Sequence, residues 1–265
     1  MKEKKIKIGY ISSSDPRDKI SWSGTHYSIW KALLAQGAEI ELLGPANPRT
    51  TIVTGKIITG VSLKIFGKRY NYLHSKMLAK CYAKIFEKKL EGKYFDLIIA
   101  PASATEVAYL KTKIPIVIIA DTTVAISLNY HKSLSNLFGF SIKETFEVEQ
   151  MALNRASLIV YSSDWAASSA IRDYNISSSN VCVIPFGANI ESVPRREDVI
   201  KKNILKKCKL LFVGTYWENK GGPVAYETFI HLLKCGIDAE LTVCGCVPNI
   251  SHPKMTVIPF LDKNK

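Results

Sequence analysis

The sequence predicts an α/β protein built from parallel sheets in two domains, and three observations support this. Helical patterns alternate with short, continuously apolar segments, which lie at 6–11, 39–44, 95–100, 115–120, 158–162 and 181–186. Continuous apolarity is typical of strands that are covered on both faces, as in a doubly wound sheet with crossover helices. A polar and charged segment at 188–207 then interrupts the pattern, and apolar periodicity resumes at Leu210.

A second, shorter α/β pattern follows the charged segment. Its expected elements are a strand, a helix and two further strands, at 209–213, 223–235, 239–244 and 255–260. Pro223 suits the first turn of the helix, and Gly236 suits its end. The predicted organisation is an N-terminal domain, a linker and a partial C-terminal domain, at 1–187, 188–207 and 208–265. Because a Rossmann-like domain needs about 100–150 residues, we expect this second domain to be incomplete and the chain to be a fragment of a longer protein.

Two helices of the N-terminal domain carry recognisable start signals. Ser141 and Glu144 have the spacing of a capping box, ahead of an amphipathic run. Asp164 follows the strand at 158–162 and is expected to cap the next helix. These signals predict structure rather than chemistry.

The apolar segments are too short to span a membrane, and the N-terminus does not have the pattern of a secretory signal. Lys7 and Gly9 interrupt the segment 6–11, so a first strand is the better interpretation. We therefore expect a cytoplasmic protein whose six cysteines are free thiols. Neither the cysteines nor the five histidines have the spacing of a metal site, so we expect no bound metal and no cofactor.

Positive charge is concentrated in one part of the chain. The formal net charge is +13, and residues 56–95 hold ten basic residues against two acidic ones. Such a segment favours a polyanionic neighbour, which could be membrane phospholipid, nucleic acid or a phosphorylated substrate. Because the chain lacks an aromatic and basic RNA-binding motif, nucleic acid is not the expected partner.

A glycine-rich corner between the first strand and the helix of the second domain is the clearest chemical motif. Gly214 ends the strand, and Lys220 precedes Gly221 and Gly222 at the helix start. The N–H groups of a first helical turn lack partners inside the helix and lie at its positive end, so they favour an anion. The corner predicts a phosphate site, and the alternative is a solvated lysine beside an ordinary turn. It matches neither the Walker A loop nor the GxGxxG dinucleotide motif.

The corner and its surroundings resemble the family 4 glycosyltransferases of the GT-B fold. In that family the second domain opens with a strand and then Gly-Arg-x-x-x-x-Lys-Gly, and Gly214, Lys220 and Gly221 stand at this spacing. Further similar segments extend the resemblance over nearly the whole chain, at 21–45, 158–191, 231–246 and 256–261.

The resemblance implies two Rossmann-like domains facing a cleft, and transfer of a sugar from a nucleotide-diphosphate sugar to a glycan or lipid-linked acceptor. It implies a retaining hexosyltransferase, without a metal, that acts in envelope polysaccharide synthesis. Lys220 would stabilise the leaving diphosphate, and Asp121 would accept hydrogen bonds from sugar hydroxyls. The implied donor-binding residues are Gly24, Thr25, Gly214, Thr215, Lys220, Gly221, Gly222, Gly245 and Phe260.

Three departures from the family pattern bear on activity. Thr215 replaces the usual arginine and offers a neutral hydrogen bond in place of a charge. Asp121 follows a strand after which the family often has histidine, and a buried structural cap is as good an interpretation of it as a sugar contact. The paired-glutamate element that holds the donor in the family is expected beyond residue 265, so we expect the chain as given not to catalyse transfer by itself.

A basic amphipathic helix is predicted around residues 73–88. Leu73, Met77, Cys81 and Ile85 form an apolar stripe at i, i+4 spacing. Four lysines border this stripe, one position earlier on each turn: Lys76, Lys80, Lys84 and Lys88. The pattern favours a peripheral site on the anionic inner face of a membrane, and the alternative is a core-packed helix with a solvated lysine face.

Three other functions stay open at this point. The chain could be a non-catalytic or truncated protein of GT-B shape, or a basic protein that binds nucleic acid or membrane. It could also be a sugar-nucleotide epimerase, which would need titratable groups that the sequence does not identify.

Overall fold

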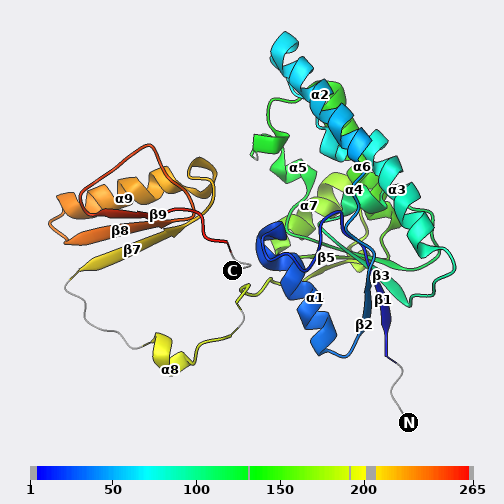
Figure 1. Ribbon diagram of the computed structural model, residues 1–265, viewed down its shortest axis with the longest axis horizontal. Helices are drawn as coiled ribbons and strands as arrows, with labels where there is room; N and C mark the ends of the chain where they lie inside the picture. The colour runs from blue at the N-terminus through cyan, green and yellow to red at the C-terminus, as the bar shows by residue number, and fades with distance from the viewer. Residues whose placement is uncertain (1–4, 131, 191, 201–206, 263–265) are drawn as a thin grey trace. The chain divides into compact units, whose positions relative to one another are not determined.

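The computed structural model describes residues 5–130, 132–190, 192–200 and 207–262 (Figure 1). The chain divides into two compact units, Met1–Asn189 and Ile190–Lys265, which are named unit 1 and unit 2 and are described separately.

Unit 1 is built on a six-stranded parallel sheet in the order β2-β1-β3-β4-β5-β6. Its strands are β1 (Lys7–Tyr10), β2 (Glu39–Leu42), β3 (Leu97–Pro101), β4 (Ile116–Ala120), β5 (Leu158–Tyr161) and β6 (Val181–Val183). All five neighbouring pairs are parallel. Because each strand lies within or overlaps a predicted apolar segment, the predicted doubly wound parallel sheet is confirmed.

Helices cover both faces of this sheet. The α-helices are α1 (Thr25–Ala35), α2 (Arg49–Phe66), α3 (Lys76–Leu90), α4 (Ala104–Val107), α5 (Val124–Ser127), α6 (Gly139–Arg155) and α7 (Asp164–Tyr174). Short 3₁₀ turns are η1 (Ser21–Gly24), η2 (Tyr72–His74), η3 (Lys132–Leu134) and η4 (Ser178–Asn180). In β3, Ile99 packs in the core that includes Trp30 of α1, whereas Ile98 packs in the larger core that includes Phe86 of α3. Two-sided burial therefore explains why the strand segments are apolar without alternation.

Two predicted helix starts are wrong in detail. Helix α6 begins at Gly139, and Ser141 accepts a hydrogen bond from the Asn71 N–H at 2.8 Å instead of capping its own helix. Glu144 accepts from the Tyr70 hydroxyl, so both residues tie α6 to the segment before α3. Helix α7 is capped by Ser163, whose side chain accepts from the Ala166 N–H. Asp164 is the first helical residue, where its charge favours the helix dipole.

One side of α2 is anchored to the rest of unit 1, because its backbone lies close to Tyr72. Gly55 is the buried residue of this helix, and a Cβ at this position would lie 2.4 Å from the Tyr72 Cβ. The Thr59 hydroxyl donates a 2.6 Å hydrogen bond to the Tyr70 carbonyl. Glycine at position 55 is therefore required by packing and not by backbone conformation.

We predict that Gly55→Ala and Gly60→Ala change stability in opposite directions. The added methyl group at position 55 overlaps Tyr72, so the free energy of unfolding should fall by about 1–3 kcal/mol. Position 60 has no atom within 4 Å of the new Cβ. Alanine there should raise the free energy of unfolding by about 0.5–1 kcal/mol, because it restricts the unfolded chain. Urea unfolding followed by circular dichroism measures both, and equal effects of the two substitutions would contradict the packing argument.

Unit 2 has a three-stranded parallel sheet in the order β7-β8-β9, with α9 against one face. Its elements are α8 (Arg196–Val199), β7 (Cys208–Val213), η5 (Glu218–Lys220), α9 (Gly222–Lys234), β8 (Ala239–Cys244) and β9 (Met255–Ile258). Phe229 of α9 is fully buried against Phe212, Leu241 and Val243. Leu211 and Val213 alternate with Phe212 along β7, point to the other face and are exposed.

Candidate functional site

Unit 1 carries its candidate site at the carboxyl edge of its sheet. The chain places β2 on one side of β1 and β3 on the other, so the order reverses at this point. Ligands of open α/β sheets bind at such a switch point, outside the carboxyl ends of the strands. The segments that leave β1 and β3 there are residues 11–20 and 102–103.

The loop before α1 has an unusual backbone that its neighbours hold in place. Trp22, Ser23 and Gly24 have positive φ angles of 46°, 58° and 93°. The Trp22 ring packs against Phe186 at 5.4 Å between centroids, and the Asn189 amide donates to the Ser23 carbonyl and to the Thr25 hydroxyl. Left-handed residues in a run cost energy and are found mainly where function requires them. Of the two predicted donor contacts, Gly24 is buried and Thr25 is already hydrogen-bonded to Asn189.

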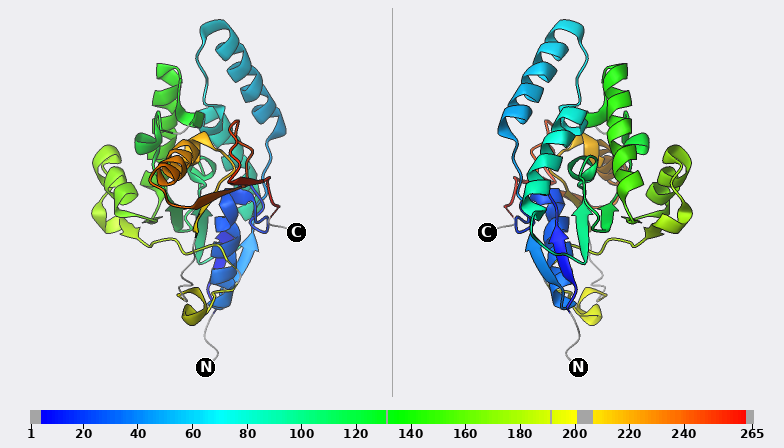
Figure 2. Two further views of the ribbon diagram at one scale, coloured as in Figure 1. Left: turned by 90° about the vertical axis from the view of Figure 1, so that its left-hand side faces the viewer. Right: turned by 90° about the vertical axis from the view of Figure 1, so that its right-hand side faces the viewer.

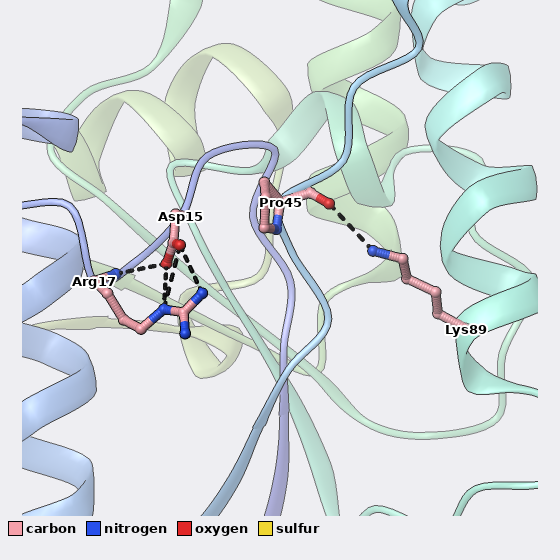
Figure 3. A network of polar contacts seen from close by, with 4 residues as sticks. All are labelled: Asp15, Arg17, Pro45 and Lys89. Carbon is pink, nitrogen blue, oxygen red and sulfur yellow. Dashed lines mark hydrogen bonds and ion pairs between the residues drawn. The ribbon is translucent and has the colours of Figure 1, made fainter.

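Polar contacts fix the neighbouring loops that follow β1 and β2 (Figure 3). The Arg17 guanidinium pairs with both carboxylate oxygens of Asp15, at 2.8–3.2 Å, and this lowers the pKa of Asp15. The Lys89 ammonium donates to the Pro45 carbonyl at 3.2 Å. Gly44 lies so close to the loop after β1 that a Cβ would be 2.2 Å from the Ser12 carbonyl oxygen. These contacts hold the loops after β1 and β2, which border the switch point.

A buried carboxyl group, which the sequence reading missed, joins the two sides of the switch point. Glu106 of α4 is 6% exposed, and its carboxyl group is hydrogen-bonded by the side chain and the backbone of Ser13. Burial raises the pKa of Glu106 above its ordinary value. Glu106 therefore couples the loop after β1 to the helix after β3.

A pocket of about 160 Å³ opens beside the carboxyl ends of β3 and β4. Its lining combines apolar side chains with polar ones, and the polar residues are His74, Ser103, Thr105, Asp121, Thr122, Thr123, Ser127 and Glu149. The predicted site residue Asp121 lies in this lining and is exposed, not buried as a structural cap would be. Hydroxyl and carboxylate groups of this kind can hydrogen-bond a polyhydroxylated ligand.

Glu149 is one of two strongly perturbed groups of this pocket, and the other is His74, whose pKa is lowered to about 4 by burial. Glu149 is 8% exposed, accepts a 2.8 Å hydrogen bond from the Val124 N–H and is hydrogen-bonded by the Tyr174 hydroxyl. Burial outweighs both hydrogen bonds and raises the pKa of Glu149 to about 7. A signal for it exists in the sequence, because Ser141, Thr145 and Glu149 repeat at i, i+4 on the buried face of α6.

We predict that Glu149→Gln reduces the loss of stability between about pH 4.5 and pH 7. The folded protein holds the Glu149 proton more tightly than an unfolded chain does, since the pKa rises from 4.5 to about 7. Stabilisation from this group is complete below the lower value and is lost as the pH rises through the higher one. Between acidic pH and pH 8, the free energy of unfolding of wild type should therefore fall by about 1–3 kcal/mol more than that of Glu149→Gln.

Urea unfolding at several pH values measures this difference, and Glu147→Gln is the matched control. Glu147 belongs to the same helix but is half-exposed and paired with Lys76, which lowers its pKa. Its loss should not flatten the decline above pH 5. Parallel curves for wild type and Glu149→Gln would contradict the assigned pKa of Glu149.

Unit 2 has its candidate site at the carboxyl edge of β7 and β8, where two glycines come together. The Gly214 N–H donates to the Cys244 carbonyl at 2.9 Å, and a Cβ on Gly245 would lie 2.9 Å from the Gly214 carbonyl oxygen. A Cβ on Gly214 would lie 3.1 Å from the Lys220 Cβ. The glycines therefore let the stem of Lys220 lie against the strand end. Lys220 is exposed and forms no ion pair with the described residues.

The turn before α9 differs from the predicted phosphate loop in one respect. The N–H groups of Gly221 and Gly222 donate to the Glu218 and Trp217 carbonyls, so they are not free for an anion as expected. A Cβ on Gly222 would lie 2.1 Å from the Trp217 ring, which packs on Phe212 at 5.0 Å. Gly222 therefore makes room for an indole. The ammonium of Lys220 and the positive end of α9 are what this turn offers to an anion.

The remaining predicted donor contacts are accessible. Thr215, which follows Gly214, is exposed, and Phe260 is 54% exposed. Gly245 has a φ of 102°, which favours glycine. In the part of the chain that the structure describes, no three His, Cys, Asp or Glu side chains gather in a way that could hold a metal ion.

The predicted lysine-bordered stripe does not match the buried face of α3. The buried residues of this helix are Leu78, Ala79, Tyr82, Ala83 and Phe86, whereas Leu73 and Met77 of the predicted stripe are exposed. Lys76 pairs with Glu147, and Lys80 lies 5.4 Å from the Tyr109 ring centroid. Lys84 and Lys88 are exposed. Helix α3 thus uses its apolar face for the core of unit 1.

Comparison with known proteins adds evidence on the fold. No protein-family model and no curated protein sequence matches the chain. Among solved structures, sucrose-phosphate synthase from Thermosynechococcus elongatus is similar with a TM-score of 0.59 and 12% identity, over 98% of this chain and 71% of that chain. Apo UGT2 from Phytolacca americana is similar with a TM-score of 0.52 and 11% identity, over 98% and 73%.

The chain has the GT-B fold. Its two parallel Rossmann-like sheets, the larger one first, are the units that this fold combines. At 11–12% identity the likeness concerns the fold alone. The resemblance to family 4 stays a prediction.

Proposed function

We propose that the protein is a glycosyltransferase that moves a sugar from a nucleotide-diphosphate sugar to a glycan or lipid-linked acceptor. The observation that carries this proposal is Lys220, an exposed lysine with no ion-pair partner among the described residues. It lies at the positive end of α9, beside the glycine edge of β7 and β8 in a GT-B fold. The diphosphate is the negatively charged part of a nucleotide-sugar donor, so it gains the most from a nearby cation. Transfer with retention of configuration and a role in envelope polysaccharide synthesis belong to the same proposal.

The chemistry assigns different tasks to the two edges. The bond between the anomeric carbon and the diphosphate oxygen breaks, and the acceptor oxygen forms the new bond on the same face of the sugar. The acceptor proton leaves with the departing nucleoside diphosphate. Lys220 stabilises the growing negative charge on the diphosphate, which is where transition-state stabilisation has most effect. Asp121 accepts hydrogen bonds from hydroxyls of the sugar or the acceptor in the pocket beside β4.

Thr215 makes the proposed donor site depend heavily on one cation. The family pattern has arginine at this position, and threonine supplies a hydroxyl but no charge. Gly24 and Thr25 of unit 1 stay predicted donor contacts, and neither carries a charge. Removal of the Lys220 charge should therefore leave little to hold a diphosphate.

We predict that Lys220→Met weakens the binding of nucleoside diphosphates about tenfold or more, which corresponds to one charge-assisted hydrogen bond. Methionine keeps an alkyl stem against Gly214 and removes the charge. Isothermal titration with UDP, GDP and ADP measures the effect and identifies the base. Lys234→Met is the matched control, since Lys234 is exposed at the negative end of the same helix.

Unchanged affinity of Lys220→Met for the nucleotide that wild type binds would overturn the assignment of Lys220. Binding of nucleoside diphosphate without turnover on any sugar donor would favour the non-catalytic alternative. Where turnover is found, the anomeric configuration of the product, from proton coupling constants, tests retention.

We also propose a cytoplasmic location with peripheral contact to an anionic membrane surface. Support comes from the ten basic residues at 56–95 and from the lipid-linked class of acceptor. None of the described helices combines the length and the apolar composition that a bilayer span requires. The sequence pattern suggests Lys76, Lys80, Lys84 and Lys88 as contacts of such a surface.

A further inference from the structure

The outward face of α2 is apolar, which is the reverse of an ordinary surface helix. Val53, Ile57, Val61 and Ile65 stand at i, i+4 spacing on one face, and they are 48%, 60%, 50% and 65% exposed. Polar side chains normally occupy the solvent face of a helix on a globular protein. We name these four residues the outer stripe.

The outer stripe points away from the body of unit 1. Gly55 and Thr59, which anchor α2 to Tyr72 and Tyr70, are each two positions from Ile57, about 200° around the helix axis. Helix α2 projects beyond the rest of its unit in both views of Figure 2. In its last turns, residues 60–66, every residue except Ser62 is exposed. No rearrangement of side chains within the anchored face would cover the stripe.

Further apolar side chains gather at the end of α2. Phe66 is 66% exposed and contacts Phe138, with ring centroids 5.9 Å apart. Phe138 in turn stacks on Phe140, which is 63% exposed. The apolar surface therefore extends from the helix onto the start of α6. Neighbouring exposed apolar side chains that are bordered by charged ones are typical of an interaction surface.

In the stretch of sequence that contains α2, all charged residues are basic. No aspartate or glutamate occurs between Glu41 and Glu87. Four basic residues of α2 and the turn after it are exposed: Arg49, Lys56, Lys64 and Lys68. They form no ion pairs with the described residues, so they can meet a negatively charged partner.

We propose that α2 docks on an anionic lipid surface, with the outer stripe in the boundary between headgroups and acyl chains and its basic residues at the lipid phosphates. A second copy of the chain would bring lysines against lysines at this patch, which disfavours self-association. A nucleic acid would match the charge but would leave Ile57 and Ile65 in water. An anionic bilayer matches both the apolar stripe and the charge.

This docking extends the peripheral location proposed above and does not rest on the transfer chemistry. It also assigns lipid contact to a different element from the lysine-bordered helix that the sequence pattern favoured. The basic residues of α2 would act together with apolar side chains, whereas the apolar face of α3 is already buried in the core. Attachment through α2 would hold unit 1 where a lipid-linked acceptor is found.

Flotation of the full chain with vesicles, in the absence of any donor, tests the proposal. Wild type should float with vesicles that contain about 30% phosphatidylglycerol, float poorly with pure phosphatidylcholine, and be partly released by about 0.5 M NaCl. The triple variant Ile57→Ser, Val61→Ser, Ile65→Ser should partition into the anionic vesicles about tenfold less or weaker still. The triple variant Lys56→Gln, Lys64→Gln, Lys68→Gln should lose the preference for anionic vesicles.

Two matched controls separate the outer stripe from other features. Leu211→Ser with Val213→Ser removes equally exposed apolar side chains from unit 2 and should float as wild type does. Lys80→Gln, Lys84→Gln, Lys88→Gln should float with little loss if α2 is the docking element. Circular dichroism and nucleotide titration should show that the triple serine variant is folded and keeps wild-type donor affinity.

Several outcomes would overturn the proposal. They are failure of wild type to float with anionic vesicles, flotation of the triple serine variant at the wild-type level, and loss of flotation only in the α3 lysine variant. A wild-type dimer that the serine substitutions convert to a monomer, without vesicle binding, would assign the outer stripe to self-association. Lys220→Met should float as wild type does. The flotation result therefore does not depend on whether Lys220 binds the donor.

Discussion

Parallel strand pairing is the constraint on which both candidate edges depend. In a parallel sheet all carboxyl ends lie along one edge, and each crossover returns the chain to the opposite edge. The loops that carry Gly24, Ser13 and Asp121 are brought together in unit 1 for this reason. Gly214 and Gly245 are brought together in unit 2 by the same rule. At Gly214 and Gly245 the two backbones approach so closely that a residue with a Cβ would not fit at position 245.

Charge is distributed unequally between the interior and the surface of the molecule. Glu106 and Glu149 lie inside unit 1, where burial favours their protonated forms and hydrogen bonds hold their positions. The cations instead remain at the surface, as Lys220 does at the end of α9 and as the lysines of α2 do. The raised pKa of Glu149 reduces the negative charge that this residue brings to the pocket beside β4. Lys220 and the exposed lysines of α2 have no ion-pair partner among the described residues, so they can attract phosphate, in a donor or in a lipid.

Much of the fold could be predicted from the sequence, because two-sided burial leaves apolar segments that are easy to recognise. The six strands of unit 1 and the strand–turn–helix corner at Lys220 follow from such segments and from glycine spacing. The role of Gly222 could not be predicted, since a glycine that admits an indole and a glycine that admits a phosphate look alike in a sequence. Helix α2 escaped recognition because its Ile, Val and Thr residues favour strands and its two glycines favour neither structure. Its outer stripe becomes visible only once the anchored face is known.

The position of Trp217 has a practical consequence for studying this molecule. The sequence has four tryptophans, and Trp217 is the one that belongs to unit 2. Its indole rests on Gly222 and Phe212, three residues from Lys220. Indole emission depends on nearby charge and on solvent access, so a phosphate arriving at the ammonium should alter the fluorescence of this ring. The corner therefore contains its own optical reporter, and ligand occupancy can be followed there without a label.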